Sequence, residues 1–216
     1  VWELTMDSLY YQLNPHFLYN TLDNIYMMAR LAKQQNIMKM TQALSTLLKI
    51  SLNKGDGNVT VAGELDHVSS YLEIQKIRFG DKFHYKIQCD EKIKAKKIIK
   101  LILQPIVENS IKYGFAGTEE EGVILIQAAQ MEESIIFSVY NSGNPIDEMK
   151  MEDLNRITHM TQEEMKQTFF TEKGGFGIYN IVTRMRMAYG AAFEIHYSKP
   201  ESGGTLCTIK IPLEVN

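Results

Sequence analysis

The spacing of the apolar residues changes at Gly80, and this change limits what the chain can fold into. Before Gly80, apolar residues recur every three or four positions, which is typical of one face of a helix. After Gly80 they alternate with polar residues, as over residues 83–88, which is typical of a half-buried strand. The sequence therefore predicts two units with a boundary at Gly80, spanning residues 1–80 and 81–216.

The first unit is predicted to be helical. The helical periodicity covers residues 4–32, 37–52 and 62–78, with Pro15 expected to kink the first helix and Thr60 to cap the third. The first two segments form a helical hairpin. The first helix carries two apolar stripes, and one hairpin partner cannot cover both, so we expect a second copy of the chain to cover the other. The stripes are Leu9, Leu13 and Phe17, then Leu18, Leu22, Ile25, Ala29 and Ala32.

The second unit mixes strands and helices without strict alternation. A polar, irregular stretch over residues 141–177 separates its two halves. The predicted fold class is α+β, with a helix layer on one face of a mixed, largely antiparallel sheet. Strands are expected over residues 83–88, 123–128, 134–140, 193–198 and 205–211, and helices over residues 97–113 and 178–189.

Composition excludes several classes of protein. The 216 residues include 23 Lys and Arg against 26 Asp and Glu, a formal net charge of -3, which argues against a general nucleic-acid binder. Cys89 and Cys207 lie far apart without clustered His, so neither a disulfide framework nor a zinc site is indicated. No window is apolar enough to span a membrane. Because the chain begins at Val1 within a helical pattern, we expect a fragment of a longer protein.

The segment QLNPHFLYN places His16 on a helix directly after Pro15. A histidine on an amphipathic helix is usually structural or solvated. Here Asn20 lies one turn further along and can hydrogen-bond an imidazole nitrogen. A neutral imidazole held in one tautomer is a nucleophile towards phosphorus, so His16 and Asn20 are candidate catalytic residues.

The segment LQPIVENSIKYG brings a carboxylate, an amide and an ammonium group together. An amphipathic core helix explains its apolar residues but leaves Glu108, Asn109 and Lys112 on an adjoining face. Their chemistry suits hydrated magnesium and phosphates.

Three glycine-containing segments follow in the second half of the chain. Residues 141–145 (NSGNP) follow an apolar strand, residues 174–177 (GGFG) precede a helix, and residues 203–205 (GGT) open the last strand. Each can be turn chemistry alone. Glycines before a helix N-terminus also provide backbone N–H groups for a phosphate.

Together these motifs resemble the sensor histidine kinases of two-component systems, specifically the LytS/YesM type. The resemblance covers essentially the whole chain, and its most specific segments are QLNPHFLYNTL, YLEIQKIRFGDKF and LILQPIVENSIKYG. It implies a helical dimerisation and histidine phospho-acceptor domain over residues 1–80. It also implies a Bergerat-type ATP-binding catalytic domain, an α/β sandwich, over residues 81–216.

The resemblance assigns roles by position. It implies that His16 is the phospho-acceptor and that Asn109 is the magnesium ligand, with Glu108 as its acidic neighbour. The other implied nucleotide contacts are Lys112 near the phosphates, Asn141 and Gly143 in the adenine pocket, Gly175 and Gly177 in the phosphate lid, and Gly204 and Thr205 on the adenine side. Residues 147–173 would form a mobile lid. Two positions depart from the family pattern: Asn141 stands where an Asp is common, and Tyr113 where a His is common.

The resemblance implies a protein histidine kinase that uses ATP and Mg²⁺ to phosphorylate itself on His16. The phosphoryl group would pass to an aspartate of a response regulator. The expected form is a homodimer on the cytoplasmic side of the cell membrane, with the membrane part missing from this chain. Two alternatives stay open: a Bergerat-fold ATPase that drives dimer closure, and a non-catalytic dimeric scaffold whose pocket has decayed at Asn141.

Overall fold

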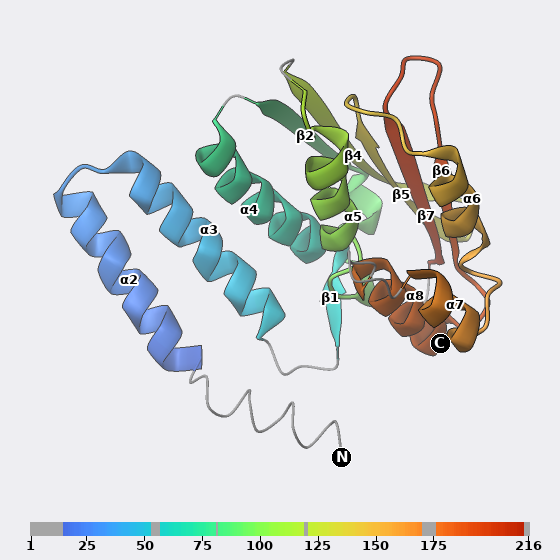
Figure 1. Ribbon diagram of the computed structural model, residues 1–216. Helices are drawn as coiled ribbons and strands as arrows, with labels where there is room; N and C mark the ends of the chain where they lie inside the picture. Colours follow the sequence, from blue (N-terminus) through green and yellow to red (C-terminus); the bar gives the residue numbers. More distant parts are fainter. Residues whose placement is uncertain (1–14, 53–56, 81, 119–120, 170–175, 214–216) are drawn as a thin grey trace.

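A computed structural model describes residues 15–52, 57–80, 82–118, 121–169 and 176–213. Two antiparallel helices, α2 (Pro15–Leu31) and α3 (Gln35–Ser51), extend from one side of a unit that combines a sheet with several helices (Figure 1). The predicted hairpin and the predicted α+β fold class are confirmed. The segment before Pro15, on which the expected kink depends, and Leu9 and Leu13 of the first apolar stripe lie outside the described residues, whereas Phe17 of that stripe is exposed.

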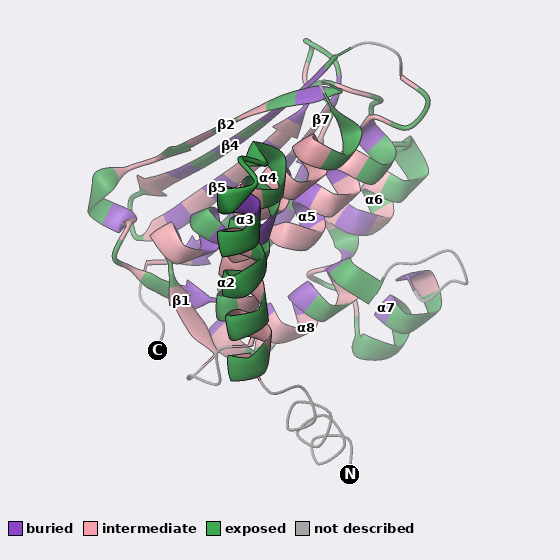
Figure 2. Cartoon of the chain, turned by 90° about the vertical axis from the view of Figure 1, so that its left-hand side faces the viewer, coloured by how far each residue is buried: buried purple, intermediate pink, exposed green. Residues whose placement is uncertain are grey.

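The hairpin buries few of its residues. Only Ala29 of α2 and Thr41 and Ala43 of α3 are buried, and α2 is largely exposed along its length (Figure 2). Several of its exposed side chains are apolar, among them Met28, which is 70% exposed, and Leu31, which is 82% exposed. Exposed apolar side chains on a helix are typical of an interaction surface.

Helix α4 (Val61–Phe79) begins and ends where the sequence predicts. The Thr60 hydroxyl accepts a hydrogen bond from the Gly63 N–H at 3.1 Å, and Gly80, with a φ of 66°, ends the helix. α4 contacts α3 on one side and β2 and α5 on the other. α4 therefore contacts elements of both predicted units. The boundary at Gly80 stays a prediction.

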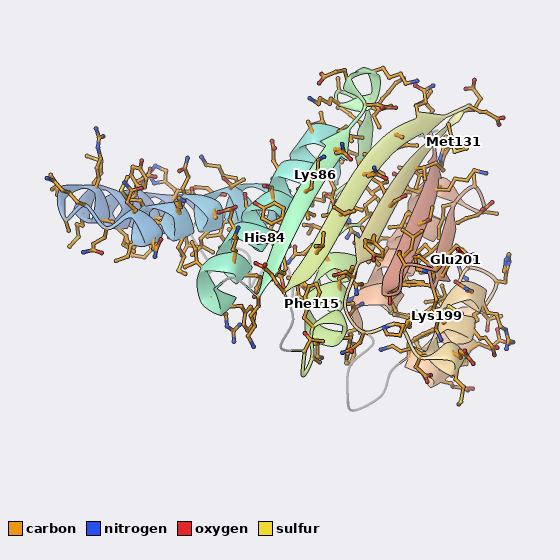
Figure 3. All side chains as sticks on the ribbon, turned by 90° about the horizontal axis from the view of Figure 1, so that it is seen from above. His84, Lys86, Phe115, Met131, Lys199 and Glu201 are labelled. Carbon is orange, nitrogen blue, oxygen red and sulfur yellow. The ribbon has the colours of Figure 1, made fainter. Side chains whose placement is uncertain are left out.

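The main sheet has five strands in the order β2 (Phe83–Cys89), β4 (Gly122–Met131), β5 (Ser134–Asn141), β7 (Thr205–Pro212) and β6 (Glu194–Ser198). β2 and β4 are parallel, and the other three pairs are antiparallel, as predicted. Alternate residues such as Ile126 and Phe137 are fully buried beneath the helices. His84 and Lys86 of β2 are exposed on the other face of the sheet (Figure 3).

The predicted helix over residues 97–113 is wrong in its first half. Residues 97–99 form strand β3 (Lys97–Ile99), which pairs with β1 (Asn58–Thr60). The helix α5 (Gln104–Asn109) follows a loop and continues as a π-helical turn, η2 (Ser110–Gly114). A short 3₁₀ helix, η1 (Glu91–Ile93), precedes β3.

The loop before α5 is held by contacts with residues distant in sequence. Its Leu101 has a φ of 62°, which no helix tolerates. The buried Glu64 carboxylate accepts the N–H groups of Leu101, Ile102 and Leu103 at 2.7, 2.7 and 2.9 Å. Burial raises the pKa of Glu64, and these N–H groups act in the opposite direction. Arg184 donates to the Lys100 carbonyl on the other side of the loop.

The described residues between 142 and 169 are strand-free, as predicted, but they are not irregular. They contain α6 (Glu148–Arg156) and α7 (Gln162–Phe169), whose Leu154 and Met165 are buried in the core. The Asn155 side chain bonds both the N–H and the carbonyl of Tyr197, at 2.6 and 2.9 Å, and so joins α6 to the edge strand β6. The predicted last helix is α8 (Phe176–Tyr189).

Candidate nucleotide-binding site

A cavity lies where β5 and β7 meet α5, the π-helical turn and α6. Its volume is about 210 Å³, or about 740 Å³ when the space at its open mouth is included. Its apolar lining includes Ile106, Val139, Ile146, Leu154 and Cys207, and its polar lining includes Asn109, Ser110, Asn141, Asn144, Asp147, Lys150 and Thr205. Mostly apolar walls with a few polar groups suit a flat heteroaromatic ring joined to a charged tail.

Asn141 is the most buried amide of the cavity. It is the last residue of β5, it lies opposite Thr205 of β7, and it is 3% exposed. Its Nδ2 has no hydrogen-bond partner within the described part of the chain. A buried polar group without a partner costs about 1–3 kcal/mol, so this amide is suited to a ligand or a bound water.

Glycines are required around Asn141 because three chain segments approach one another closely. A side chain at Gly143 would overlap the Gly114 carbonyl, and one at Gly204, which has a φ of 79°, would overlap the Asn141 carbonyl. The predicted site residues Gly143 and Gly204 thus have a packing reason for their identity. Gly177 faces Pro105 of α5, and Gly175 lies outside the described residues.

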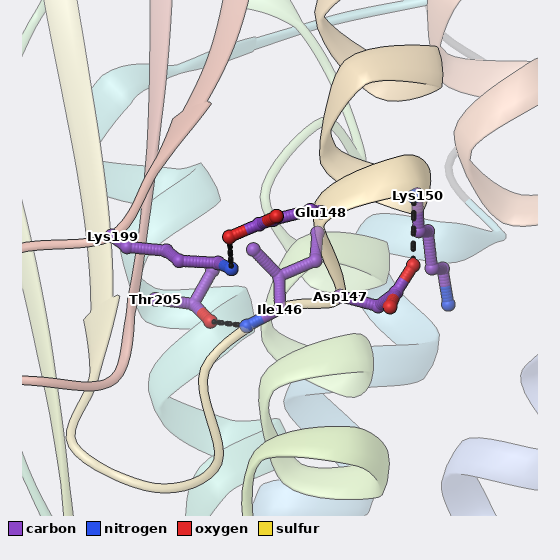
Figure 4. Close-up of polar contacts among 6 residues, drawn as sticks. All are labelled: Ile146, Asp147, Glu148, Lys150, Lys199 and Thr205. Atoms are coloured by element: carbon purple, nitrogen blue, oxygen red, sulfur yellow. Dashed lines mark hydrogen bonds and ion pairs between the residues drawn. The ribbon is translucent and has the colours of Figure 1, made fainter.

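The loop after β5 is fastened on both sides. The Asn144 N–H donates to the Gly114 carbonyl at 2.6 Å, and its side chain donates to the Ala116 carbonyl at 2.9 Å. The Thr205 hydroxyl accepts the Ile146 N–H at 2.9 Å, directly before the Asp147 cap of α6 (Figure 4). Thr205 therefore both lines the cavity and holds the loop that leads to α6.

Two lysines contact the Tyr113 ring near the cavity. The Lys150 Nζ lies 4.0 Å from the ring centroid and that of Lys112 lies 5.0 Å from it. Lys150 also lines the cavity. It was not among the predicted site residues, because residues 141–177 were expected to be irregular. Asp147 followed directly by the acidic Glu148 is a helix N-cap signal, and it could have placed Lys150 in the first turn of a helix.

Asn109 and Glu108 are neighbours in sequence but point to different surroundings. Asn109 lines the cavity, whereas the Glu108 carboxylate accepts a hydrogen bond from the Gln104 amide at 2.7 Å and is not part of the lining. Burial raises the pKa of Tyr71 to about 12, and the nearby Glu108 charge adds to the shift. Tyr71 belongs to α4, so Glu108 lies on the α4 side of α5.

Magnesium fits this cavity only as a partly hydrated ion. The described residues contain no group of three His, Cys, Asp or Glu side chains able to enclose a metal. Asn109 is the predicted ligand that lines the cavity, and Mg²⁺ commonly takes its remaining ligands from phosphates and water.

His16 lies in the first turn of α2, exposed, with its Nδ1 3.2 Å from the Asn20 Nδ2. α2 packs on α3, α3 on α4, and α4 on α5, so the hairpin lies on the far side of α4 from the cavity (Figure 1). The structure therefore brings together Asn109, Asn141 and Thr205, with Lys112 near them, and keeps His16 and Asn20 apart from them.

Two family models match successive stretches of the chain. Residues 4–83 match the histidine kinase model, and residues 95–215, more than half of the 216-residue chain, match that of the histidine kinase-, DNA gyrase B-, and HSP90-like ATPases. The chain belongs to this ATPase family. The resemblance to sensor histidine kinases that the motifs indicate is confirmed.

Curated relatives of this family match nearly the whole chain. Sensor histidine kinase YesM of Bacillus subtilis is 31% identical over 97% of the chain and 33% of the relative. Sensor protein LytS of Oceanobacillus iheyensis is 28% identical over 93% of the chain and 33% of the relative. Sensor protein kinase HptS of Staphylococcus aureus is 27% identical over 98% of the chain and 39% of the relative. The chain thus spans a third to two fifths of these relatives.

Solved structures share the fold. The catalytic domain of histidine kinase ThkA aligns with a TM-score of 0.52 at 23% identity, over 74% of this chain and 97% of that domain. Full-length ShkA in complex with AMPPNP aligns with a TM-score of 0.51 at 17% identity, over 97% of this chain and 46% of ShkA. Among the described residues of this ATPase-family chain, no helix is long and apolar enough to cross a membrane.

Proposed function

We propose that this chain is the catalytic part of a sensor histidine kinase that phosphorylates itself on His16. The observation that carries the proposal is the pairing, in one chain, of the cavity at Asn141 and Asn109 with a helical hairpin that presents a histidine. The phosphoryl group then passes from His16 to an aspartate of a response regulator. The matches to both family models support this reading.

In this proposal the adenine ring enters the apolar part of the cavity, and its amino group donates a hydrogen bond to the Asn141 Oδ1. Thr205 keeps the loop above the ring in place through its bond to Ile146. Asn109 holds Mg²⁺, which would neutralise charge on the phosphates. Lys112 and Lys150 attract the phosphates to the cavity mouth, and Gly175 and Gly177 belong to the lid over them.

His16 is the proposed nucleophile. Its Nε2 lone pair attacks the γ-phosphorus, the bond to the β-phosphate oxygen breaks, and ADP leaves. This requires the ring proton on Nδ1. The Asn20 Nδ2 lies 3.2 Å from Nδ1, so the amide must turn for its Oδ1 to accept the Nδ1–H; after the ring loses that proton, the Asn20 NH₂ donates to Nδ1. Glu108 is the proposed acceptor of the proton. His16 and the cavity lie on opposite sides of α4. The hairpin must therefore move relative to the cavity, or His16 must come from a second copy.

The proposed form is a homodimer joined through the hairpin. The exposed apolar side chains of α2, including Phe17, Met28 and Leu31, suit a helical bundle with a second copy. In the whole protein, the membrane part would precede this chain and place it on the cytoplasmic side. The partners are then ATP, a second copy and the receiver aspartate of a response regulator.

A second candidate is a dimeric scaffold whose cavity no longer binds ATP, and the neutral Asn141 motivates it. The test is incubation with γ-labelled ATP, followed by separate measurement of acid-labile protein phosphate and of released phosphate. A kinase forms labelled protein, an ATPase releases phosphate without labelling, and a scaffold does neither. Asn109→Ala should abolish labelling while the circular dichroism spectrum stays unchanged; normal labelling of this variant would refute the magnesium assignment.

A further inference from the structure

Three side chains are linked by hydrogen bonds, from His67 of α4 through Gln104 to the predicted catalytic carboxylate of Glu108. The His67 Nε2 lies 2.6 Å from the Gln104 Oε1, and the Gln104 Nε2 donates to the Glu108 Oε1 at 2.7 Å. His67 is 1% exposed, and Gln104 and Glu108 lie one turn apart on α5. The contacts thus connect two helices and end on Glu108.

The direction of each hydrogen bond follows from chemistry. An ionised carboxylate only accepts, so the Gln104 NH₂ must face Glu108 and its Oε1 must face His67. An amide oxygen also only accepts, so the His67 Nε2 carries the proton and donates. His67 thereby selects one of the two amide orientations of Gln104, the one that offers a donor to Glu108.

The Gln104 amide is uncharged, so it orients the Glu108 carboxylate without neutralising its charge. A lysine or arginine at position 104 would pair with the Glu108 charge, whereas an amide donor leaves that charge available. The His67 Nδ1 has no partner among the described residues, although the side chain is buried. A leucine at this position would avoid that cost, so packing alone gives no reason for a histidine there.

We infer that His67 and Gln104 are positioning residues that hold the Glu108 carboxylate for the phosphorylation step. The inference rests on the proposed function. α4 contacts α3 of the hairpin on its other side, so His67 also makes the placement of Glu108 depend on where α4 lies. Neither His67 nor Gln104 contacts the nucleotide cavity, so ATP binding does not need them.

The test measures the rate of His16 labelling at saturating ATP, together with the Kd for ATP, in variants of the full chain. Gln104→Met keeps the side-chain length and removes both bonds, and His67→Leu removes the donor. Both should lower the rate by about tenfold to a hundredfold with the Kd unchanged, because a misplaced catalytic group loses that much. His67→Gln, which carries an N–H donor near the Nε2 position, should restore most of the rate.

The matched control is Tyr85→Phe. The Tyr85 hydroxyl donates to Glu73 of α4 at 2.5 Å, so this variant removes a different hydrogen bond at the α4–sheet interface without touching Gln104 or Glu108. Its rate should stay within about twofold of the unmodified chain. If Tyr85→Phe slows labelling as much as Gln104→Met does, the effect is general loosening of α4 and the inference is overturned.

A double-mutant cycle separates positioning from a purely structural role. In a Glu108→Gln background, Gln104→Met should cause no further loss of rate, because its effect acts through the carboxylate. Additive losses would overturn the inference, and so would a Glu108→Gln variant that labels at the normal rate. In both cases labelling of the unmodified chain on His16 would leave the proposed function intact. If the unmodified chain does not label His16, the proposed function itself fails.

Discussion

At the scale of single residues, the cavity depends on Asn141, a neutral amide where the family resemblance leads us to expect an Asp. Its side chain is buried beside Gly114, and its Nδ2 has no partner in the described part of the chain. The resemblance to sensor histidine kinases predicted that position 141 lines the pocket, and Asn141 does line the cavity. The surrounding glycines were predicted as ligand contacts, but in the structure they are explained by backbone approach, which residue type alone does not reveal.

Asn141→Asp should tighten ATP binding by up to about tenfold, which equals about 1.4 kcal/mol, because it supplies a charged acceptor for the adenine amino group. GTP should bind more weakly than ATP to both forms, since its carbonyl would face an acceptor. Isothermal titration calorimetry measures both affinities. Weaker ATP binding by Asn141→Asp would mean that the amide acts as a donor, and the adenine assignment would be wrong.

Cys207, in the cavity wall, predicts a pH dependence of stability. Burial raises the pKa of its thiol to about 12, against about 8.5 for an ordinary thiol. The folded pKa is the higher one, so the stabilisation is complete below about pH 8.5 and is lost as the pH rises towards 12. Between pH 8 and pH 11, the unfolding free energy of the unmodified chain should therefore fall relative to that of Cys207→Ala. Urea titrations measure it, and a constant difference would contradict the assignment.

At the scale of elements, the periodicity of apolar residues was sufficient to predict the hairpin, α4, α8 and the five strands of the main sheet. It failed at residues 97–103 because Glu64, distant in sequence, takes the N–H groups that a helix would use. It missed α6 and α7 because their short apolar faces are stabilised by contacts from elsewhere, such as the bonds of Arg186 to the carbonyls of Ile157 and Thr158. Such contacts are tertiary and leave no local period.

Glu64→Ala should therefore lower the free energy of unfolding by about 3 kcal/mol or more, because it leaves three N–H groups without their acceptor. Glu91→Ala is the matched control. It removes an exposed pair with Lys94 and should change stability by less than about 1 kcal/mol. Urea denaturation compares the two. Equal losses would contradict the role given to Glu64.

At the scale of the whole molecule, the hairpin and the unit that contains the five-stranded sheet differ in how far they bury their apolar side chains. The sheet-containing unit buries a continuous core, whereas α2 exposes several apolar side chains. The two predicted stripes account for this only in part: Phe17 and Ile25 belong to them, whereas Met27, Met28 and Leu31 belong to neither stripe. The arrangement of His16 relative to the cavity was beyond such prediction, because it depends on how α3, α4 and α5 pack.

We expect the chain to be a dimer through α2 at micromolar concentration. Met28→Glu should shift it towards the monomer, because it places a charge in the apolar contact. Met187→Glu is the control: Met187 is 84% exposed and lies on α8, away from the hairpin. Light scattering coupled to size exclusion measures the mass. A monomeric unmodified chain, or equal effects of the two variants, would contradict the assignment.

The most direct test of the account is identification of the residue that γ-labelled ATP phosphorylates in the purified chain. We expect an acid-labile, alkali-stable phosphate on His16, and we expect His16→Ala to abolish it while the affinity of this variant for ATP stays normal. Labelling that persists in His16→Ala, or ATP binding without any protein phosphate, would contradict it.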